Sequence, residues 1–176
     1  MRQLALIRGI NVGGKNIIKM TELKQLFEKI GLIEVKTYIQ SGNVIFCNLA
    51  HSNAKSKIEE ALSDKLKDDI KISILTEADL DAIVSNKPDG FGSETDKYKY
   101  DVIFMIEPLT ASEALNIIKA KEDLDGIYSA NKVLYIRRLK EGLHFPNLLK
   151  LPIYKNITIR NWNTTVKLSE MMKNNN

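Results

Sequence analysis

The residue types best suited to binding chemistry lie in two short polar segments near the N-terminus. Each segment combines turn-forming glycines with polar side chains, and the first segment also carries two cations. Small glycine turns with exposed amides, next to cations, can form a cradle for an anion or a nucleotide. The candidate ligand-binding residues in these two segments are Arg8, Asn11, Gly13, Gly14, Lys15, Gln40, Ser41 and Asn43.

The glycines also have a purely structural interpretation. Gly13 and Gly14 can supply the positive φ angles that a tight turn needs. The spacing differs from the phosphate-binding motif G-x-x-x-x-G-K-[ST], because Asn16 follows Lys15 and the next predicted helix begins several residues later. Arg8 ends an apolar strand, so its guanidinium must reach solvent, a carboxylate or a ligand.

A second polar cluster, residues 160–165, precedes the C-terminal part of the chain. Asn161 or Asn163 can cap a helix there. Trp162 either packs against a sheet or offers a stacking surface for a base. Arg160 pairs either with a phosphate or with a carboxylate. Arg160 and Trp162 therefore complete the set of candidate ligand-binding residues.

Catalytic constellations are scarce in this sequence. His51 and His144 are far apart and lack a metal-binding spacing, and there is no G-x-S-x-G nucleophile elbow. Cys47 is the single cysteine, which excludes a disulfide framework, and it closes an apolar strand where we expect a buried, inert thiol. We predict no metal site and no cofactor, and whether the protein is an enzyme stays open.

Composition and charge favour a soluble globular protein. Hydrophobic residues make up 44% of the 176 residues, which is too many for an intrinsically disordered chain. The net charge of +4 is a weak sign of a polyanionic partner, because positive and negative side chains alternate over residues 55–71. No segment approaches the ~18 apolar residues of a membrane span, and a signal-peptide core is absent. We therefore expect a cytoplasmic protein without membrane contact.

Apolar periodicity predicts a split βαβ arrangement, typical of ferredoxin-like domains, in the first part of the chain. The predicted order is strand, helix, strand, strand, helix, strand, with strands at 3–8, 34–40, 43–47 and 70–75. A two-residue turn at Ser41 and Gly42 joins the second and third strands. In this topology the loop after the first strand and this hairpin lie at the same end of the sheet.

The second part of the chain repeats the order strand, helix, strand, strand. We predict an α+β fold of two ferredoxin-like modules in tandem, the second ending irregularly with a C-terminal helix. A loop at 85–96, rich in turn residues, separates them. The predicted domains are a first module with its linking helix at 1–86, a second α+β module at 97–173 and a disordered tail at 174–176.

Several of these segments resemble a known family. Residues 6–16, 18–20 and 37–44 are similar to the N-terminal signature of the bacterial family called domain of unknown function 1697, and residues 158–164 are similar to its C-terminal signature. The resemblance implies an α+β protein of this length built from two similar halves, without an established activity or assigned catalytic residues. Residues 147–152 depart from the family, because they are mostly apolar where members often carry Ser and basic residues.

Three functions remain open from the sequence. We expect a binding protein for a small anionic or nucleotide-like ligand, or for a short nucleic acid, at the glycine-rich loop and the adjacent hairpin. The first alternative is an enzyme acting on a phosphorylated or acyl substrate at the same loop. The second alternative is a structural or protein-interaction module without a ligand. The sequence does not indicate an oligomeric state.

Overall fold

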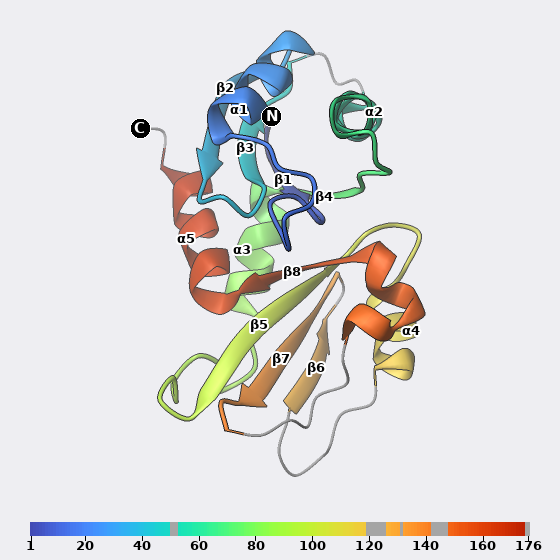
Figure 1. Cartoon of the computed structure of the whole chain (residues 1–176). Coiled ribbons are helices and arrows are strands. Elements are labelled where there is room, and N and C mark those ends of the chain that lie inside the picture. The colour runs from blue at the N-terminus through green and yellow to red at the C-terminus, as the bar shows by residue number, and fades with distance from the viewer. Residues whose placement is uncertain (50–52, 119–125, 131, 142–147, 175–176) are drawn as a thin grey trace. The chain divides into compact units, whose positions relative to one another are not determined.

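The computed structural model describes the chain except for residues 50–52, 119–125, 131, 142–147 and 175–176 (Figure 1). His51, His144 and the last two residues of the predicted disordered tail thus lie outside the described residues. The chain divides into two compact units. The first unit is Met1–Leu80 with Glu170–Asn176, and the second unit is Asp81–Ser169.

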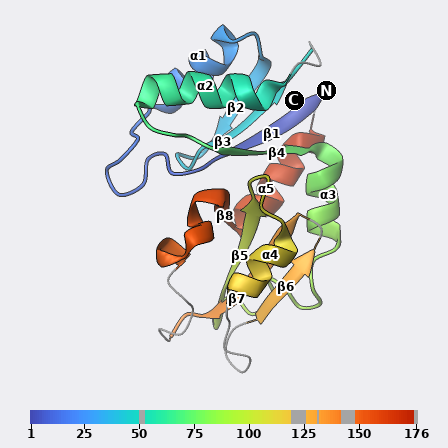
Figure 2. The ribbon, with the colours of Figure 1, turned by 90° about the vertical axis from the view of Figure 1, so that its right-hand side faces the viewer.

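The first unit contains a four-stranded antiparallel sheet with strand order β2-β3-β1-β4. Helices α1 and α2 lie over the same face of this sheet (Figure 2). Alternate residues of the strands point toward these helices, so that side chains such as Ala5 and Phe46 join Phe27 and Leu62 in one core. In chain order the elements are β1 (Arg2–Ile7), α1 (Met20–Lys29), β2 (Ile33–Tyr38), β3 (Asn43–Cys47), α2 (Ala54–Leu66) and β4 (Ile72–Thr76).

The second unit contains another four-stranded antiparallel sheet, with strand order β6-β7-β5-β8. Helix α4 packs on one face of it, and Thr110 and Glu113 form a reciprocal capping box at the start of that helix. The elements that follow β4 are α3 (Glu77–Ser85), β5 (Tyr98–Met105), α4 (Ala111–Ile117), β6 (Gly126–Ala130), β7 (Val133–Leu139), two 3₁₀ helices (Leu148–Lys150 and Pro152–Asn156), β8 (Ile157–Asn161) and α5 (Trp162–Lys173).

The fold class is thus α+β, with two four-stranded antiparallel sheets and, in the described part of the chain, five α-helices. This confirms the predicted α+β class and is consistent with two tandem modules. The loop predicted at 85–96 contains no helix or strand beyond the end of α3 at Ser85. The domain boundaries predicted at residues 86 and 97 stay a prediction.

The turn between β2 and β3 differs from the sequence prediction. Strand β2 ends at Tyr38, so four residues, 39–42, join the two strands instead of two. Ile39 takes a φ of +46° and Gly42 a φ of +74°, and both reverse the chain. A Cβ at Gly42 would lie 2.9 Å from the Ile10 side chain, so only glycine fits there. The amide of Ile7 donates to the Gly42 carbonyl, which ties this turn to the end of β1.

Candidate functional site

The glycine-rich loop after β1 folds into a miniature β-hairpin at residues 11–16, which we call the finger hairpin. Val12 and Lys15 form an antiparallel bridge, and the Lys15 amide donates to the Val12 carbonyl at 3.1 Å. Gly13 and Gly14 lie between them with φ angles of +59° and +74°, the positive pair that a type I′ turn requires. The two glycines therefore shape a turn, and helix α1 begins only at Met20.

Two asparagines brace the base of the finger hairpin. The Asn11 carboxamide donates to the carbonyls of Ile18 and Gln40, both at 3.0 Å, and accepts from the Ile18 amide at 2.9 Å. The Asn16 carboxamide donates to the Gly9 carbonyl at 3.2 Å and to Asp68 Oδ2 at 2.8 Å. These contacts hold the finger hairpin against the β2–β3 turn on one side and against Asp68 on the other.

The β2–β3 turn and the first residue of β3 contain three more of the predicted site residues. Asn43 is fully buried, and its Nδ2 donates to the Tyr38 carbonyl at 3.0 Å and to Ser41 Oγ at 2.9 Å. The Gln40 carbonyl accepts from Asn11 while the rest of the residue is exposed. The structure therefore brings the finger hairpin and the turn together at one end of the sheet, as predicted, and uses Asn11 and Asn43 to hold them there.

The charged groups at this end include Arg8, Lys15 and Asp68, and also the exposed pair of Lys71 and Asp69, with 2.9 Å between Lys71 Nζ and Asp69 Oδ1. Lys15 is exposed beside the tip of the finger hairpin, and Arg8 is half-buried at the end of β1. Hydrogen bonds from the Asn16 side chain and the Asp69 amide lower the pKa of Asp68, and the positive charges of Arg8 and Lys15 lower it further. Asp68 is therefore an ionised carboxylate and a weak base at neutral pH. The sequence could not indicate Asp68, because it lies 52 residues from Asn16.

Three apolar side chains around the finger hairpin are exposed to solvent. Ile17 is 72% exposed, Val12 61% and Ile39 50%. Ile39 also has a positive φ, which a β-branched residue rarely adopts. Ile17 precedes Ile18, and Ile39 precedes Gln40. The Asn11 side chain donates to the carbonyls of Ile18 and Gln40, so Asn11 helps to position both exposed side chains. Exposed apolar side chains rimmed by polar groups are typical of interaction surfaces.

The other two predicted site residues, Arg160 and Trp162, lie in the second unit. Arg160 is 7% exposed, and its Nη1 donates to Thr158 Oγ1 and to the Ile159 carbonyl, both at 2.8 Å. Burial lowers the pKa of the Arg160 guanidinium to about 10. Trp162 is 8% exposed and packs edge-on against Phe91, with 5.3 Å between the ring centroids. Most of the Trp162 surface is therefore buried by packing, as the structural interpretation of this residue predicts.

The cap of the last helix comes from the same segment. Asn161 Oδ1 accepts from the Asn163 amide at 2.9 Å, next to the first residue of α5. This is one of the two capping residues that the sequence predicts.

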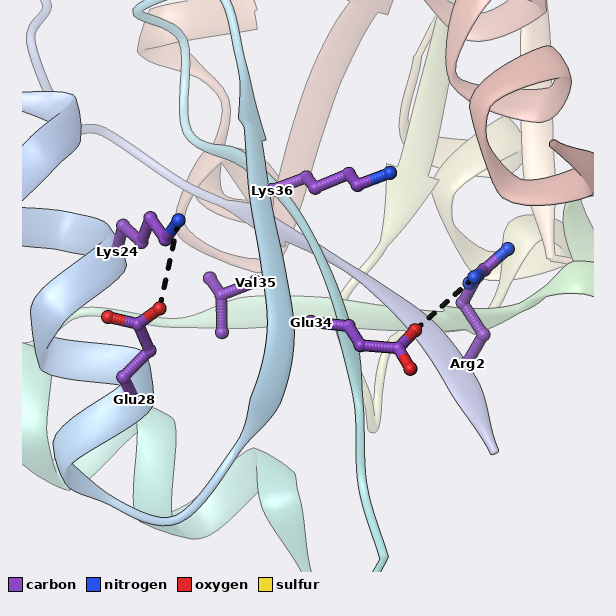
Figure 3. Close-up of a pocket in the computed structure, with 6 residues that line it drawn as sticks. All are labelled: Arg2, Lys24, Glu28, Glu34, Val35 and Lys36. Carbon is purple, nitrogen blue, oxygen red and sulfur yellow. Dashed lines mark hydrogen bonds and ion pairs between the residues drawn. The ribbon is translucent and has the colours of Figure 1, made fainter. Parts of the chain in front are cut away.

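A groove of about 630 Å³ lies in the first unit, beside the edge strand β2 (Figure 3). Four of its five charged side chains form two ion pairs: Lys24 Nζ lies 3.8 Å from Glu28 Oε1, and Arg2 Nη2 lies 3.4 Å from Glu34 Oε2. Figure 3 shows each of these pairs with the cation pointing toward its carboxylate. Val35 and Lys36 complete the lining. The two carboxylates therefore weaken the attraction of the groove for an anion.

Cys47 lies next to this groove and is only half-buried, so the expectation of a buried thiol was wrong. It ends β3, an inner strand of the sheet, and its Sγ donates to Glu34 Oε2 at 3.3 Å. Desolvation raises the pKa of the Cys47 thiol, and the hydrogen bond to Glu34 raises it further. The thiol is thereby kept protonated, which is the unreactive form.

Two further features of the described residues concern metal ions and membranes. No group of three or more His, Cys, Asp or Glu side chains among them is placed to hold a metal ion. No helix in the described ranges has the length and apolar character needed to cross a membrane.

Comparison with known proteins identifies the family of this two-unit α+β chain. The sequence profile described as "protein of unknown function (DUF1697)" matches residues 1–135, and the chain belongs to this family, which confirms the resemblance seen in the sequence. A solved structure, that of the conserved bacterial protein SP0830 from Streptococcus pneumoniae, is similar to the chain, with 30% sequence identity, a TM-score of 0.84 and coverage of 98% of each chain. No curated protein matches this two-unit chain.

Proposed function

We propose that this protein binds a phosphate-bearing ligand, a nucleotide or a short nucleic acid, at the end of the first unit that carries the finger hairpin. The observation that carries the proposal is the finger hairpin itself, which is braced at its base and holds Lys15 exposed next to two glycine amides. The amides of Gly13 and Gly14 donate to no other described residue. A lysine and outward-facing amides on one rigid turn form a suitable donor set for a phosphate.

The apolar side chains beside Lys15 extend this surface. Val12, Ile17 and Ile39 would contact the sugar and base of a nucleotide while Lys15 and Arg8 contact the phosphate. Asp68 neutralises part of the positive charge, so we expect modest affinity. Binding should weaken as salt is added, because Lys15 and Arg8 contact the phosphate.

The same electrostatics argue against an acid–base enzyme at this loop. A general base works best when its pKa is close to the working pH. The pKa of Asp68 is instead lowered by Asn16, by the Asp69 amide and by the two cations. A binding role therefore fits the finger hairpin better than acid–base catalysis does.

A protein-interaction role is the second candidate for this end of the unit. It is favoured by the exposure of Val12, Ile17 and Ile39, since such apolar side chains also suit a protein partner. The two roles differ in the contribution of charge, because a protein partner held by apolar contacts would tolerate loss of Lys15.

The finer description of the fold is also a proposal. A ferredoxin-like assignment and a tandem duplication are supported by the strand orders β2-β3-β1-β4 and β6-β7-β5-β8, which are the same when each sheet is numbered from its first strand. Module boundaries at 1–86 and 97–173 and a cytoplasmic location are proposed on the sequence features given above.

The binding proposal is tested by fluorescence anisotropy with a short labelled oligonucleotide and by equilibrium dialysis with ATP. The variant Arg8→Gln/Lys15→Gln should bind both probes at least about tenfold more weakly, because each charge-assisted phosphate contact is lost. Its dependence of affinity on salt should also become shallower.

The control variant is Lys29→Gln/Lys57→Gln, which removes the same charge from exposed positions at the opposite end of the first unit. It should bind like the parent. Equal binding by the parent and by a folded Arg8→Gln/Lys15→Gln protein would contradict the proposal.

A further inference from the structure

A second candidate site lies in the second unit, at the open edge of β5. Strand β8 pairs with β5 only from Asp101 onward, where Asp101 faces Asn161, and then the chain turns into α5. The edge of β5 at residues 98–100 is therefore not covered by β8. A cleft of about 230 Å³ lies here, which we call the lysine cleft, and its lining residues are Thr95, Tyr98, Lys99, Tyr100, Lys140, Asn161, Trp162 and Asn163.

The lysine cleft has two cations and no carboxylate in its lining. Neither Lys99 nor Lys140 makes an ion pair with any part of the chain that the structure describes. On the neighbouring strand, by contrast, Arg138 pairs with Asp101. The two lysine ammonium groups are thus available to a ligand.

Further positive charge lies beside the cleft, around the Tyr98 ring. Arg137 Cζ lies 4.7 Å and Lys97 Nζ 5.0 Å from the centroid of this ring. Cations held over an aromatic ring keep their charge and are fixed in place. These cations add positive charge beside the cleft, and Glu94, whose charge acts on Lys97, offsets part of it.

The remaining lining groups supply donors and an apolar wall. The Thr95 hydroxyl and the Asn163 carboxamide make no hydrogen bond to the described residues, whereas Asn161 Nδ2 donates to the Tyr100 carbonyl at 3.4 Å. The rings of Tyr100 and Trp162 are mostly buried and present only small apolar surfaces. The volume is below the roughly 300–1,000 Å³ of drug-sized pockets, so the cleft fits a small molecule.

We propose that the lysine cleft binds the phosphate group of a small phosphomonoester, which lies across the open edge of β5 because Lys99 and Tyr100 point to opposite faces of this strand. Two lysines match the charge of about −1.5 to −2 on a phosphate monoester better than the single charge of a carboxylate. This inference does not rest on the proposed function of the finger hairpin, which is built from other residues in the other unit.

Trp162 provides a direct measurement, because it is the only tryptophan and it lines the cleft. Ribose 5-phosphate, which does not absorb at the wavelengths used, should change its fluorescence saturably, and unphosphorylated ribose should not. The variant Lys99→Gln/Lys140→Gln should weaken this response at least about tenfold. Both lysines are exposed, so the variant should keep the far-ultraviolet circular dichroism spectrum of the parent.

Two control variants separate this site from general charge effects and from the finger hairpin. Lys150→Gln/Lys155→Gln removes the same charge from the 3₁₀ helices that precede β8, outside the cleft lining. Arg8→Gln/Lys15→Gln removes the cations of the finger hairpin. Both should respond to ribose 5-phosphate like the parent.

Four outcomes would overturn the proposal. They are the absence of a saturable response to ribose 5-phosphate, an equal response to ribose, a stronger response to succinate than to ribose 5-phosphate, and unchanged binding by Lys99→Gln/Lys140→Gln. Loss of oligonucleotide binding by Arg8→Gln/Lys15→Gln would leave the lysine cleft unaffected, so failure of one proposal is distinguishable from failure of the other.

Discussion

The groove of the first unit and the lysine cleft of the second unit contain similar basic residues in opposite electrostatic settings. In the groove, Lys24 and Arg2 each lie next to a carboxylate, and the smaller cleft offers Lys99 and Lys140 without one. The larger cavity is therefore the weaker candidate for binding an anion. The comparison teaches that the availability of a charge, more than the size of a cavity, decides which of these surfaces can recognise a phosphate.

The end of the first unit that carries the finger hairpin lies between these two cases. Asp68 interacts with both Arg8 and Lys15, but Lys15 remains exposed next to the turn. This partial neutralisation is the reason to expect weaker and less salt-dependent binding there than in the lysine cleft.

The largest expected effect tests whether the wall of the lysine cleft depends on tight packing at Trp162. A Cβ added at Gly92 would lie 2.6 Å from Trp162 Nε1, and Gly92 has a φ of +91°. Gly92→Ala should therefore lower the free energy of unfolding by about 2–4 kcal/mol, measured by urea denaturation, and should change Trp162 fluorescence.

Gly90→Ala is the matched control in the same loop. Gly90 also has a positive φ, +69°, but its added Cβ would meet only Ser93 Oγ at 3.7 Å. Gly90→Ala should lower the free energy of unfolding by only about 1 kcal/mol, through backbone strain, and should leave Trp162 fluorescence unchanged. Equal losses for the two variants would show that Trp162 is not held by this contact.

The second prediction concerns a variant whose groove, like the lysine cleft, has no carboxylate in its lining. Glu28→Gln/Glu34→Gln removes both carboxylates while leaving Arg2, Lys24 and Lys36 in place. Phosphate binding in the groove should then increase roughly threefold, because exposed ion pairs of this kind are worth up to about 1 kcal/mol. The phosphate affinity would be measured from the chemical-shift changes of Val35 and Lys36 on titration with inorganic phosphate. An affinity equal to that of the parent would contradict the idea that the two carboxylates weaken anion binding in the groove.

The third prediction concerns pH. Hydrogen bonds from Cys47 and then from Arg2 lower the pKa of Glu34 below its usual value of 4.5. A carboxyl whose pKa is lowered on folding stabilises the protein above its unfolded pKa, and this stabilisation is lost as the pH falls through the folded pKa. The stability difference between the parent and Glu34→Gln should therefore be present at neutral pH and vanish in acid. Lys99→Gln, at a cleft without carboxylates, should show no such change.

The smallest expected effect concerns the Cys47 thiol at the margin of the groove. Glu34→Gln removes a negative charge and a carboxylate acceptor, both of which raise the pKa of the thiol. The variant should therefore contain more thiolate and react with iodoacetamide about twice as fast at pH 8. Glu28→Gln is the control, because Glu28 pairs with Lys24 instead. An unchanged rate in Glu34→Gln would mean that desolvation alone sets the pKa.

The element order and the meeting of loop and hairpin could be predicted because they depend on local patterns. Alternating apolar residues mark the strands, and antiparallel pairing then places residues 11–16 and 39–42 at the same end. The four-residue turn could not be predicted, since the positive φ of Ile39 is imposed by its surroundings and not by its residue type.

The lysine cleft was also beyond sequence reasoning, although Trp162 was recognised as a candidate. Its lining combines residues near 95–100, 140 and 161–163, and it exists because β8 stops at Asn161 while β5 begins at Tyr98. Relative strand ends are set by pairing register, which single-sequence periodicity does not reveal. Asp68 was missed for a similar reason, since only the fold brings it to Asn16.

The contact between Arg2 and the end of α5 bears on how the chain is assembled during synthesis. Arg2 Nη1 donates to the Met172 carbonyl at 3.0 Å, and Glu170–Asn176 belongs to the first unit. The ribosome must therefore release the whole sequence of the second unit before the N-terminal strand can meet this partner. The N-terminal half can form its sheet early, as domains do during translation, but Arg2 can make this contact only after residue 172 has left the ribosome.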